Sequence, residues 1–236
     1  MSKAIRSGII GLMSLACGGS LFATTLTVTG TVLDVNNGGG EYTANLTDPA
    51  VKGLDVYCVD FKNDAFFGTQ YNVVVSTIGG PTFAADTNYG GDAASAFTYY
   101  TGVYTATNRY LMAGWLTSQY NVGLGGNNAD NEGIQSAIWD LLDTDGSTHT
   151  AGNYTAWLNN AIHWETTSSA STLAAFASQI AIYDSIGGDN GDCPTPRMQE
   201  FIDPSGASAV PEPGTVSLLG FGLGLVALGA LRKRRR

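Results

Sequence analysis

The sequence predicts an α+β body in which mostly antiparallel strands come first and a helical part follows, with a single transmembrane helix at the C-terminus. Residues 25–35 alternate Thr with branched apolar residues, which is the period-two pattern of a half-buried strand. From residue 111 onward, apolar residues recur at helical spacing. Residues 215–231 carry no charge and are just long enough to span a bilayer.

Residues 1–23 have the order of a secretory signal peptide. Lys3 and Arg6 precede an apolar run over 9–15, and small residues follow over 16–20. Because the peptidase accepts only a small side chain before the cut, we expect cleavage after Ala23. Cys17 is the alternative of a lipidated cysteine, but Ser14 stands where such signals usually carry a leucine. The body is therefore expected to be exported.

Four segments of the body are expected to form strands, because each is rich in β-branched or aromatic residues and is bounded by Gly, Asn or Pro. They are residues 25–35, 54–61, 71–78 and 97–104. The glycine-rich turn over 36–40 ends the first of them.

Four apolar stripes at helical spacing follow, over residues 111–120, 134–142, 154–162 and 173–180. For the second helix, Asp130 or Asn131 is the expected N-cap, and Glu132 in the first turn complements the helix dipole. The body is expected to span residues 24–202, with a linker over 203–214 and the membrane segment with its basic end over 215–236.

The C-terminal segment combines a Pro-Glu-Pro motif, a short apolar run and a basic end. Basic residues resist translocation, so the body should lie outside the cytoplasm and the basic end inside. The motif residues are Pro211, Glu212, Pro213, Arg232, Lys233, Arg234, Arg235 and Arg236.

This order of features resembles the PEP-CTERM sorting signal of Gram-negative bacteria. In that family, a membrane protease of the exosortase type recognises the signal and removes the helix. The resemblance implies an exosortase as partner and transient anchoring in the inner membrane. It also implies a final location at the cell surface or in an exopolysaccharide matrix.

The exported body is strongly acidic. Once both ends are lost, four basic residues face all 20 acidic ones, which gives a net charge of −16. Nucleic acid is therefore excluded as a partner, because phosphate binding requires clustered cations. With only His149 and His163 as histidines, we expect neither a zinc site nor any other cofactor.

Two short pieces carry the residues for a specific chemistry. They are Tyr57-Cys58-Val59-Asp60-Phe61 and Ile134-Gln135-Ser136-Ala137-Ile138-Trp139. They resemble the Cys and Gln motifs of thioester domains in bacterial surface proteins, although Ile134 stands where that family commonly has Glu or Thr. The resemblance implies that Cys58 supplies the thiol and Gln135 the carboxamide. Tyr57 and Asp60 would flank the thiol, and Trp139, one helical turn after Gln135, would shield the bond.

A thioester forms when the thiol attacks the Gln135 carbonyl and expels ammonia, and it is a far better acyl donor than an amide. Such a body would be a single-use covalent adhesin that couples to a surface polysaccharide or protein, and not a turnover enzyme. Two alternatives stay open: a Cys58–Cys193 disulfide, and an inert buried thiol in a passive matrix protein. A polysaccharide hydrolase is disfavoured, because Asp140, Asp143 and Asp145 cluster on and after one helix without forming a convincing acid pair.

Overall fold

The structure is a computed structural model that describes residues 24–35, 39–61, 63–81, 83–91, 95–96, 103–142, 149–185 and 199–205. All of these belong to one compact unit, Phe22–Val210. The predicted signal peptide, most of the linker and the predicted transmembrane segment 215–236 lie outside the described residues.

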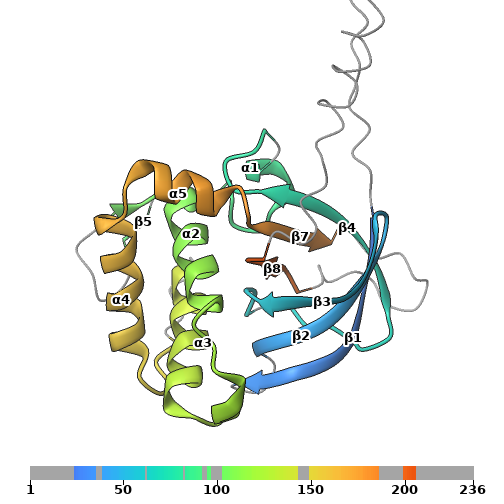
Figure 1. The fold of residues 1–236 in the computed structure, drawn as a ribbon, viewed down its shortest axis with the longest axis horizontal. Coiled ribbons are helices and arrows are strands. Elements are labelled where there is room, and N and C mark those ends of the chain that lie inside the picture. Colours follow the sequence, from blue (N-terminus) through green and yellow to red (C-terminus); the bar gives the residue numbers. More distant parts are fainter. Residues whose placement is uncertain are drawn as a thin grey trace, which may run out of the picture. The chain divides into compact units, whose positions relative to one another are not determined.

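Six strands form a closed antiparallel barrel (Figure 1). They are β1 (Thr24–Val35), β2 (Gly39–Thr47), β3 (Ala50–Cys58), β4 (Gln70–Thr77), β7 (Ala181–Ser185) and β8 (Phe201–Asp203). Around the barrel the order is β1-β2-β3-β8-β7-β4, and β4 pairs with β1 to close it. Closure pairs both sides of every strand, so the sheet has no free edge.

Alternation along the strands directs one set of side chains into the barrel. In β3, Leu54, Val56 and Cys58 are buried while the residues between them are more exposed. In β1, Leu26 and Val28 follow the same rule. The end of β3 therefore places the Cys58 thiol in an apolar interior.

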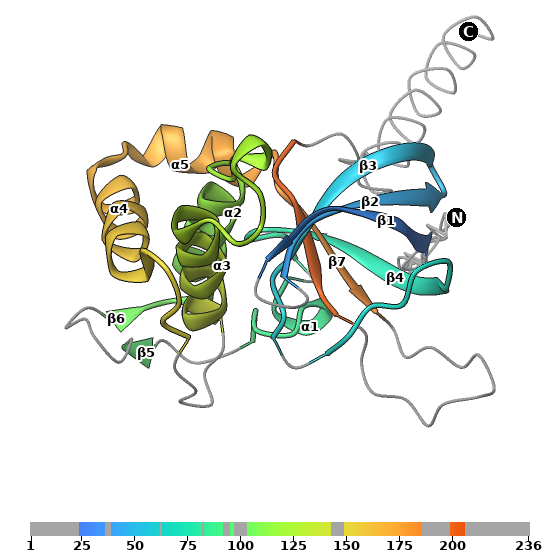
Figure 2. The ribbon, with the colours of Figure 1, turned by 90° about the horizontal axis from the view of Figure 1, so that it is seen from below.

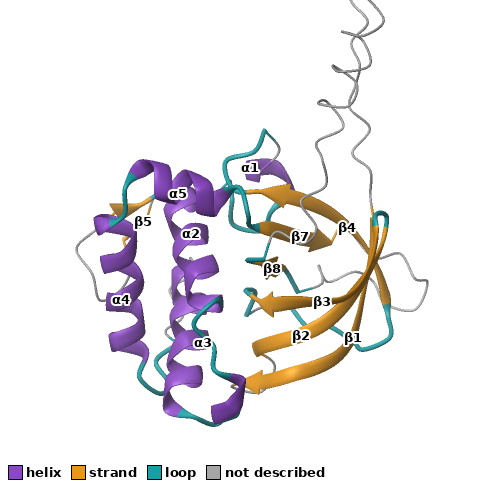
Figure 3. Ribbon diagram, viewed as in Figure 1, coloured by secondary structure: helices purple, strands orange, loops and turns teal. Residues whose placement is uncertain are grey.

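Four helices gather on one side of the barrel (Figures 2 and 3). They are α2 (Ala106–Thr117), α3 (Ala129–Leu142), α4 (Tyr154–Thr167) and α5 (Ala170–Ala177), with a 3₁₀ turn at Val122–Leu124. The short helix α1 (Phe83–Asp86) instead lies against β4. Strands β5 (Ser95–Ala96) and β6 (Val103–Tyr104) form a separate small sheet. Helices α2, α3 and α4 pack against one another, and α3 also contacts β1 and β2.

Two apolar cores result from this arrangement. The first fills the barrel and includes Tyr183, Phe201 and Trp139 of α3. The second lies between the helices and the barrel wall, where Ile182 and Ile202 face the helical residues. Because Ile182 and Tyr183 are neighbours in β7, the two faces of that strand serve the two cores, and α3 contributes to both.

The predicted fold class is wrong. The described body is a six-stranded antiparallel barrel in which β7 and β8 follow the helices and complete the sheet, whereas the prediction placed the strands first and the helices second. Every residue of β7 is buried, so this strand lacks the polar alternation that reveals a half-exposed strand, and β8 is only three residues long. Among the described helices, none is both long enough and apolar enough to cross a membrane.

The predicted N-cap of α3 is also wrong. The helix begins at Ala129, and the Asn128 side chain accepts a hydrogen bond from the Asp130 N–H at 2.9 Å. Asn131 is fully buried, and its amide donates to the Asn121 and Gly125 carbonyls at 2.9 and 2.8 Å. These bonds fix the loop that carries the chain from Tyr120 into α3.

Candidate functional site

The Cys58 thiol is fully buried at the end of β3 and is free. Its S–H donates to the Asp60 carbonyl at 3.4 Å, and the Gln199 side-chain amide donates to the sulfur. Gln199 also donates to the Asp60 carbonyl at 3.3 Å. Gln199, in the segment that leads into β8, therefore lies directly against the thiol.

Burial raises the pKa of Cys58 to about 12, although hydrogen-bonding groups of Trp139, Asp60 and Gln199 act in the opposite direction. The thiol is therefore neutral at physiological pH. The Trp139 indole lies beside it, yet its buried N–H makes no hydrogen bond of ordinary geometry within the described part of the chain.

Gln135 is fully buried on α3, at the side of the helix that faces the barrel. Its Nε2 donates to the Cys58 backbone carbonyl at 3.2 Å. Its Oε1 accepts from the Gly40 N–H and from the Tyr120 hydroxyl, each at 2.6 Å. The Gly40 N–H can only donate and the Cys58 carbonyl can only accept, so these partners fix which end of the amide carries the oxygen.

The structure thus brings together the two residues of the predicted pair. A C–N bond adds about 1.3 Å to the 3.2 Å contact, so the Gln135 carbonyl carbon lies within about 4.5 Å of the Cys58 carbonyl oxygen. The residue that carries the thiol and the carbon that a thiol would attack are therefore immediate neighbours, although 76 residues separate them along the chain.

Two glycines at the start of β2 allow the backbone to approach the carboxamide this closely. A Cβ on Gly39 would lie 2.4 Å from the Gln135 carbonyl carbon. Gly40 has φ of +105°, and a Cβ there would lie 2.0 Å from the Leu33 carbonyl oxygen. Glycine is needed at both positions, at Gly39 for space and at Gly40 for backbone conformation as well.

Tyr120 follows the end of α2 and stacks on Tyr57, with ring centroids 5.7 Å apart and planes 4° apart. Burial raises the pKa of the Tyr120 hydroxyl well above its ordinary value. The hydroxyl therefore remains a hydrogen-bond donor to Gln135 over the whole physiological range. Tyr57 contributes to the site by positioning Tyr120.

Asp60 is fully buried and anchors the loop that follows β3. Its carboxylate accepts from the Tyr89 hydroxyl and the Asn88 side-chain amide, both at 2.9 Å, and from Asn63 at 2.5 Å. Its carbonyl receives the Cys58 S–H. Asp60 thus holds the acceptor of the thiol proton in place through its own side chain.

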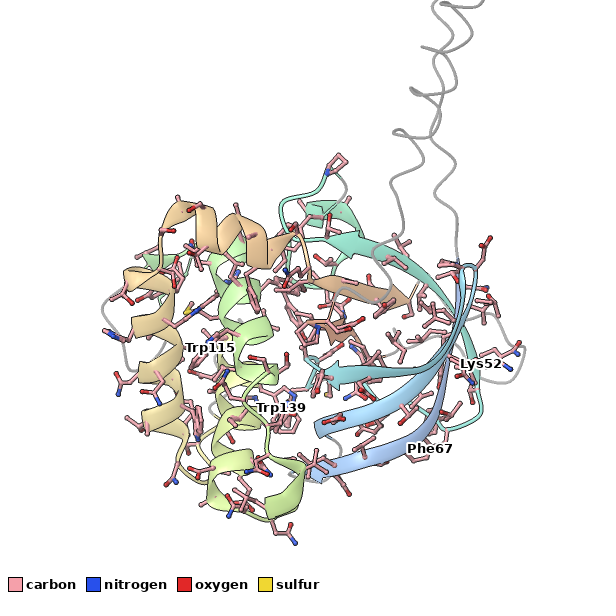
Figure 4. All side chains as sticks on the ribbon, in the orientation of Figure 1. Lys52, Phe67, Trp115 and Trp139 are labelled. Carbon is pink, nitrogen blue, oxygen red and sulfur yellow. The ribbon has the colours of Figure 1, made fainter. Side chains whose placement is uncertain are left out.

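Aromatic rings cover the thiol side of the site. Trp139 projects from α3 toward the barrel (Figure 4) and is 6% exposed. The Phe61 ring packs edge-on against Trp139, with ring centroids 5.0 Å apart, and the His149 ring centroid lies 4.0 Å from that of Phe61. Phe61 is 48% exposed. Trp139 belongs to the same buried apolar cluster as Cys58, and both Phe61 and His149 pack against Trp139.

Glu200 connects the segment that leads into β8 to the helices. Its carboxyl group accepts from the Tyr110 hydroxyl of α2 at 2.5 Å and from the Asn88 N–H at 2.7 Å. Its carbonyl accepts from the Val59 N–H at 3.1 Å. Burial raises the pKa of Glu200 to about 8, with Asp184 and Asp60 acting in the same direction.

The remaining predicted site residues, Cys193 and the sorting-motif residues 211–213 and 232–236, lie outside the described residues. Within the described ranges, no three His, Cys, Asp or Glu side chains are grouped so as to hold a metal ion. Sequence reasoning missed Tyr120, Gly40 and Gln199. Of these only Gly40 had a usable signal, because a run of glycines marks a place where backbone can approach another group closely.

Residues 209–236 match the PEP-CTERM protein-sorting motif. The predicted sorting signal is confirmed: the chain is an exported protein that an exosortase, a membrane protease, processes, with transient anchoring in the membrane beforehand. The motif covers only the C-terminal end and describes none of the barrel. No curated protein and no solved structure matches the chain.

Proposed function

We propose that the barrel body is an acyl donor that carries an internal thioester between Cys58 and Gln135, and that it couples covalently to a surface polysaccharide or protein after export. The observation that carries the proposal is the contact of the Gln135 carboxamide with the Cys58 residue, both of them fully buried, beside the apolar core of the barrel. The enclosure supports it further, because an unprotected thioester would hydrolyse.

The reaction needs no cofactor. The Cys58 sulfur attacks the Gln135 carbonyl carbon, the C–N bond breaks as the S–C bond forms, and the thiol proton leaves with the nitrogen as ammonia. Proximity is the main contribution of the fold, because free thiols and amides react negligibly. Opening by an amine then forms a C–N bond, breaks the C–S bond and returns one amine proton to the sulfur.

The rival proposal is a passive matrix protein in which Cys58 is an inert thiol or is bonded to Cys193. The apolar barrel around Cys58 would suit an inert buried thiol equally well. The two proposals differ in mass, in thiol content and in their response to amines, so a chemical measurement separates them.

We expect the exported chain to weigh one ammonia less than the mass calculated for the residues that remain after processing. Cys193→Ala should be present throughout, so that Cys58 is the only thiol left after signal cleavage. Intact-mass spectrometry should show the deficit, thiol titration of the unfolded chain should find no free thiol, and methylamine should add one amine to Gln135 while releasing the thiol.

The matched controls are Cys58→Ala and Gln135→Ala, each of which should abolish the deficit. Without the Cys193 substitution, a disulfide would instead appear as a loss of two hydrogens that a reductant reverses. A chain of full mass with a titratable Cys58, prepared without amines, would refute the thioester and leave the passive matrix role.

A further inference from the structure

The carbonyl oxygen of Gln135 has two hydrogen-bond donors on it, which is the arrangement an acyl-transfer site needs at its reacting oxygen. One donor is the Gly40 backbone N–H and the other is the Tyr120 hydroxyl, each 2.6 Å from Oε1. When a nucleophile adds to a carbonyl carbon, negative charge develops on that oxygen, and preorganised donors stabilise it.

We propose that the Gly40 N–H and the Tyr120 hydroxyl form the oxyanion hole of this site. They would hold the charge on Gln135 Oε1 both when the Cys58 sulfur attacks the amide and when an amine attacks the resulting thioester. This role rests on the proposed thioester, and it adds the groups that would catalyse both the formation of the bond and its opening by an amine.

Both donors are fixed before the reaction. Gly40 is held by the β1–β2 pairing, in which it lies opposite Asp34, at a backbone angle that a larger residue would adopt only with strain. Tyr120 is held by its stack on Tyr57 and by the Asn131 bonds to the loop that follows it. Donors that need no reorganisation contribute most to a transition state.

The leaving groups also have partners. The amide nitrogen donates to the Cys58 backbone carbonyl, so that oxygen can accept a hydrogen bond from the ammonia that leaves. When an amine opens the thioester, the sulfur leaves, and the Gln199 amide donates to it. When the thioester opens, the Gly40 and Tyr120 donors thus stabilise the charge on the oxygen, and the Gln199 amide stabilises the charge on the sulfur.

The decisive variant is Tyr120→Phe, which keeps the ring and its stack and removes one donor. In the full chain we expect its thioester to react with methylamine on the order of 100-fold more slowly than the wild-type thioester. Tyr154→Phe is the matched control: it removes a buried hydroxyl that donates to Asp140 at 2.6 Å, on a ring that belongs to the core between the helices and the barrel wall. It should open at the wild-type rate.

A Tyr120→Phe chain that carries the thioester and opens at the wild-type rate would overturn the inference, and so would equal slowing in Tyr154→Phe. A folded Tyr120→Phe chain without thioester, alongside a Tyr154→Phe chain that has it, supports the role in bond formation. A wild-type chain without the bond refutes the proposed function itself, so the two failures are distinguishable.

Infrared spectroscopy gives a second readout on the unaltered protein. In a chain labelled with carbon-13 at the glutamine side-chain carbonyl, two donors should lower the thioester stretching frequency of the folded chain below that of the same thioester in acidic urea. Removal of the Tyr120 hydroxyl should raise it toward the unfolded value. A folded band at the unfolded frequency would contradict the oxyanion hole even if the variant failed to fold.

Discussion

At the scale of single residues, Gly39 determines whether the Gln135 side chain can occupy its position. We expect Gly39→Ala to displace Gln135, because its Cβ would lie 2.4 to 2.6 Å from three atoms of that side chain. Overpacking of this kind costs about 1–3 kcal/mol in the free energy of unfolding. Urea titration should measure that loss, and intact mass should show a smaller fraction of chains with the ammonia deficit.

The chain offers a matched control for this substitution in β1. Gly30 has no atom within 4 Å of the position a Cβ would take, so Gly30→Ala should leave both the mass deficit and the site unchanged. If Gly39→Ala retained full stability and a full ammonia deficit, the close approach of backbone to carboxamide would not be what holds Gln135.

The local motifs predicted which residues would meet, and tertiary contacts decided how. Cys58 and Gln135 stand in recognisable sequence contexts, and so do Tyr57, Asp60 and Trp139. Tyr120 and Gln199 reach the site only through the fold. Gln199 is 141 residues from Cys58, in a segment with no pattern of its own. A sequence carries no local signal for a contact of that kind.

At the scale of elements, the sequence predicted the helices α2 to α5 and three of the six barrel strands, β1, β3 and β4, near their true positions, but not the closure of the sheet. Strand β1 carries a clear period-two alternation along a half-exposed surface. Strands β7 and β8 are buried on both faces, since one face lines the barrel and the other faces the helices. That burial removes the alternation from the sequence of these two strands. Strand β2 was missed as well, because the glycine run at its start was interpreted as a turn.

Glu200, which directly precedes β8 and accepts a hydrogen bond from Tyr110 of α2, should make the free energy of unfolding depend on pH. The pKa of Glu200 in the folded chain is about 8, above its ordinary value of 4.5. Between these values the unfolded chain releases the proton while the folded chain keeps it. The free energy of unfolding should therefore fall as pH rises through this window, by up to about 1.4 kcal/mol per pH unit, and level off above pH 8.

Glu200→Gln should remove most of this slope, because the amide resembles the protonated acid and can still accept from the Asn88 N–H. Urea titrations of both chains between pH 5 and pH 8, in steps of about one unit, measure it. A residual slope of the same sign is expected from Glu41, whose pKa burial also raises. Identical slopes in the two chains would contradict a protonated Glu200 in the folded state.

At the scale of the whole molecule, the sorting signal and the barrel perform separate tasks. The PEP-CTERM motif occupies residues 209–236, whereas every described site residue lies between Gly39 and Glu200. Net charge is distributed just as unevenly: five of the 11 basic residues are the last five of the chain, while all the acidic residues precede them. The acidic body and the basic end therefore meet different requirements, one in the envelope and one at the membrane.

This separation predicts that sorting can be blocked without loss of the chemistry. Replacing Pro211, Glu212 and Pro213 by Ala should prevent removal of the C-terminal helix, because the protease would lose its recognition motif. C-terminal peptide mapping of envelope protein should then recover Arg232–Arg236, which the wild-type protein loses in the same cells. Cells without the exosortase are the control, since there both chains should keep the basic end.

The triple variant should nevertheless keep the ammonia deficit at Cys58 and Gln135, because none of its substitutions lies within the barrel. Loss of both processing and the mass deficit would mean that the thioester depends on sorting, and the two tasks would not be separate.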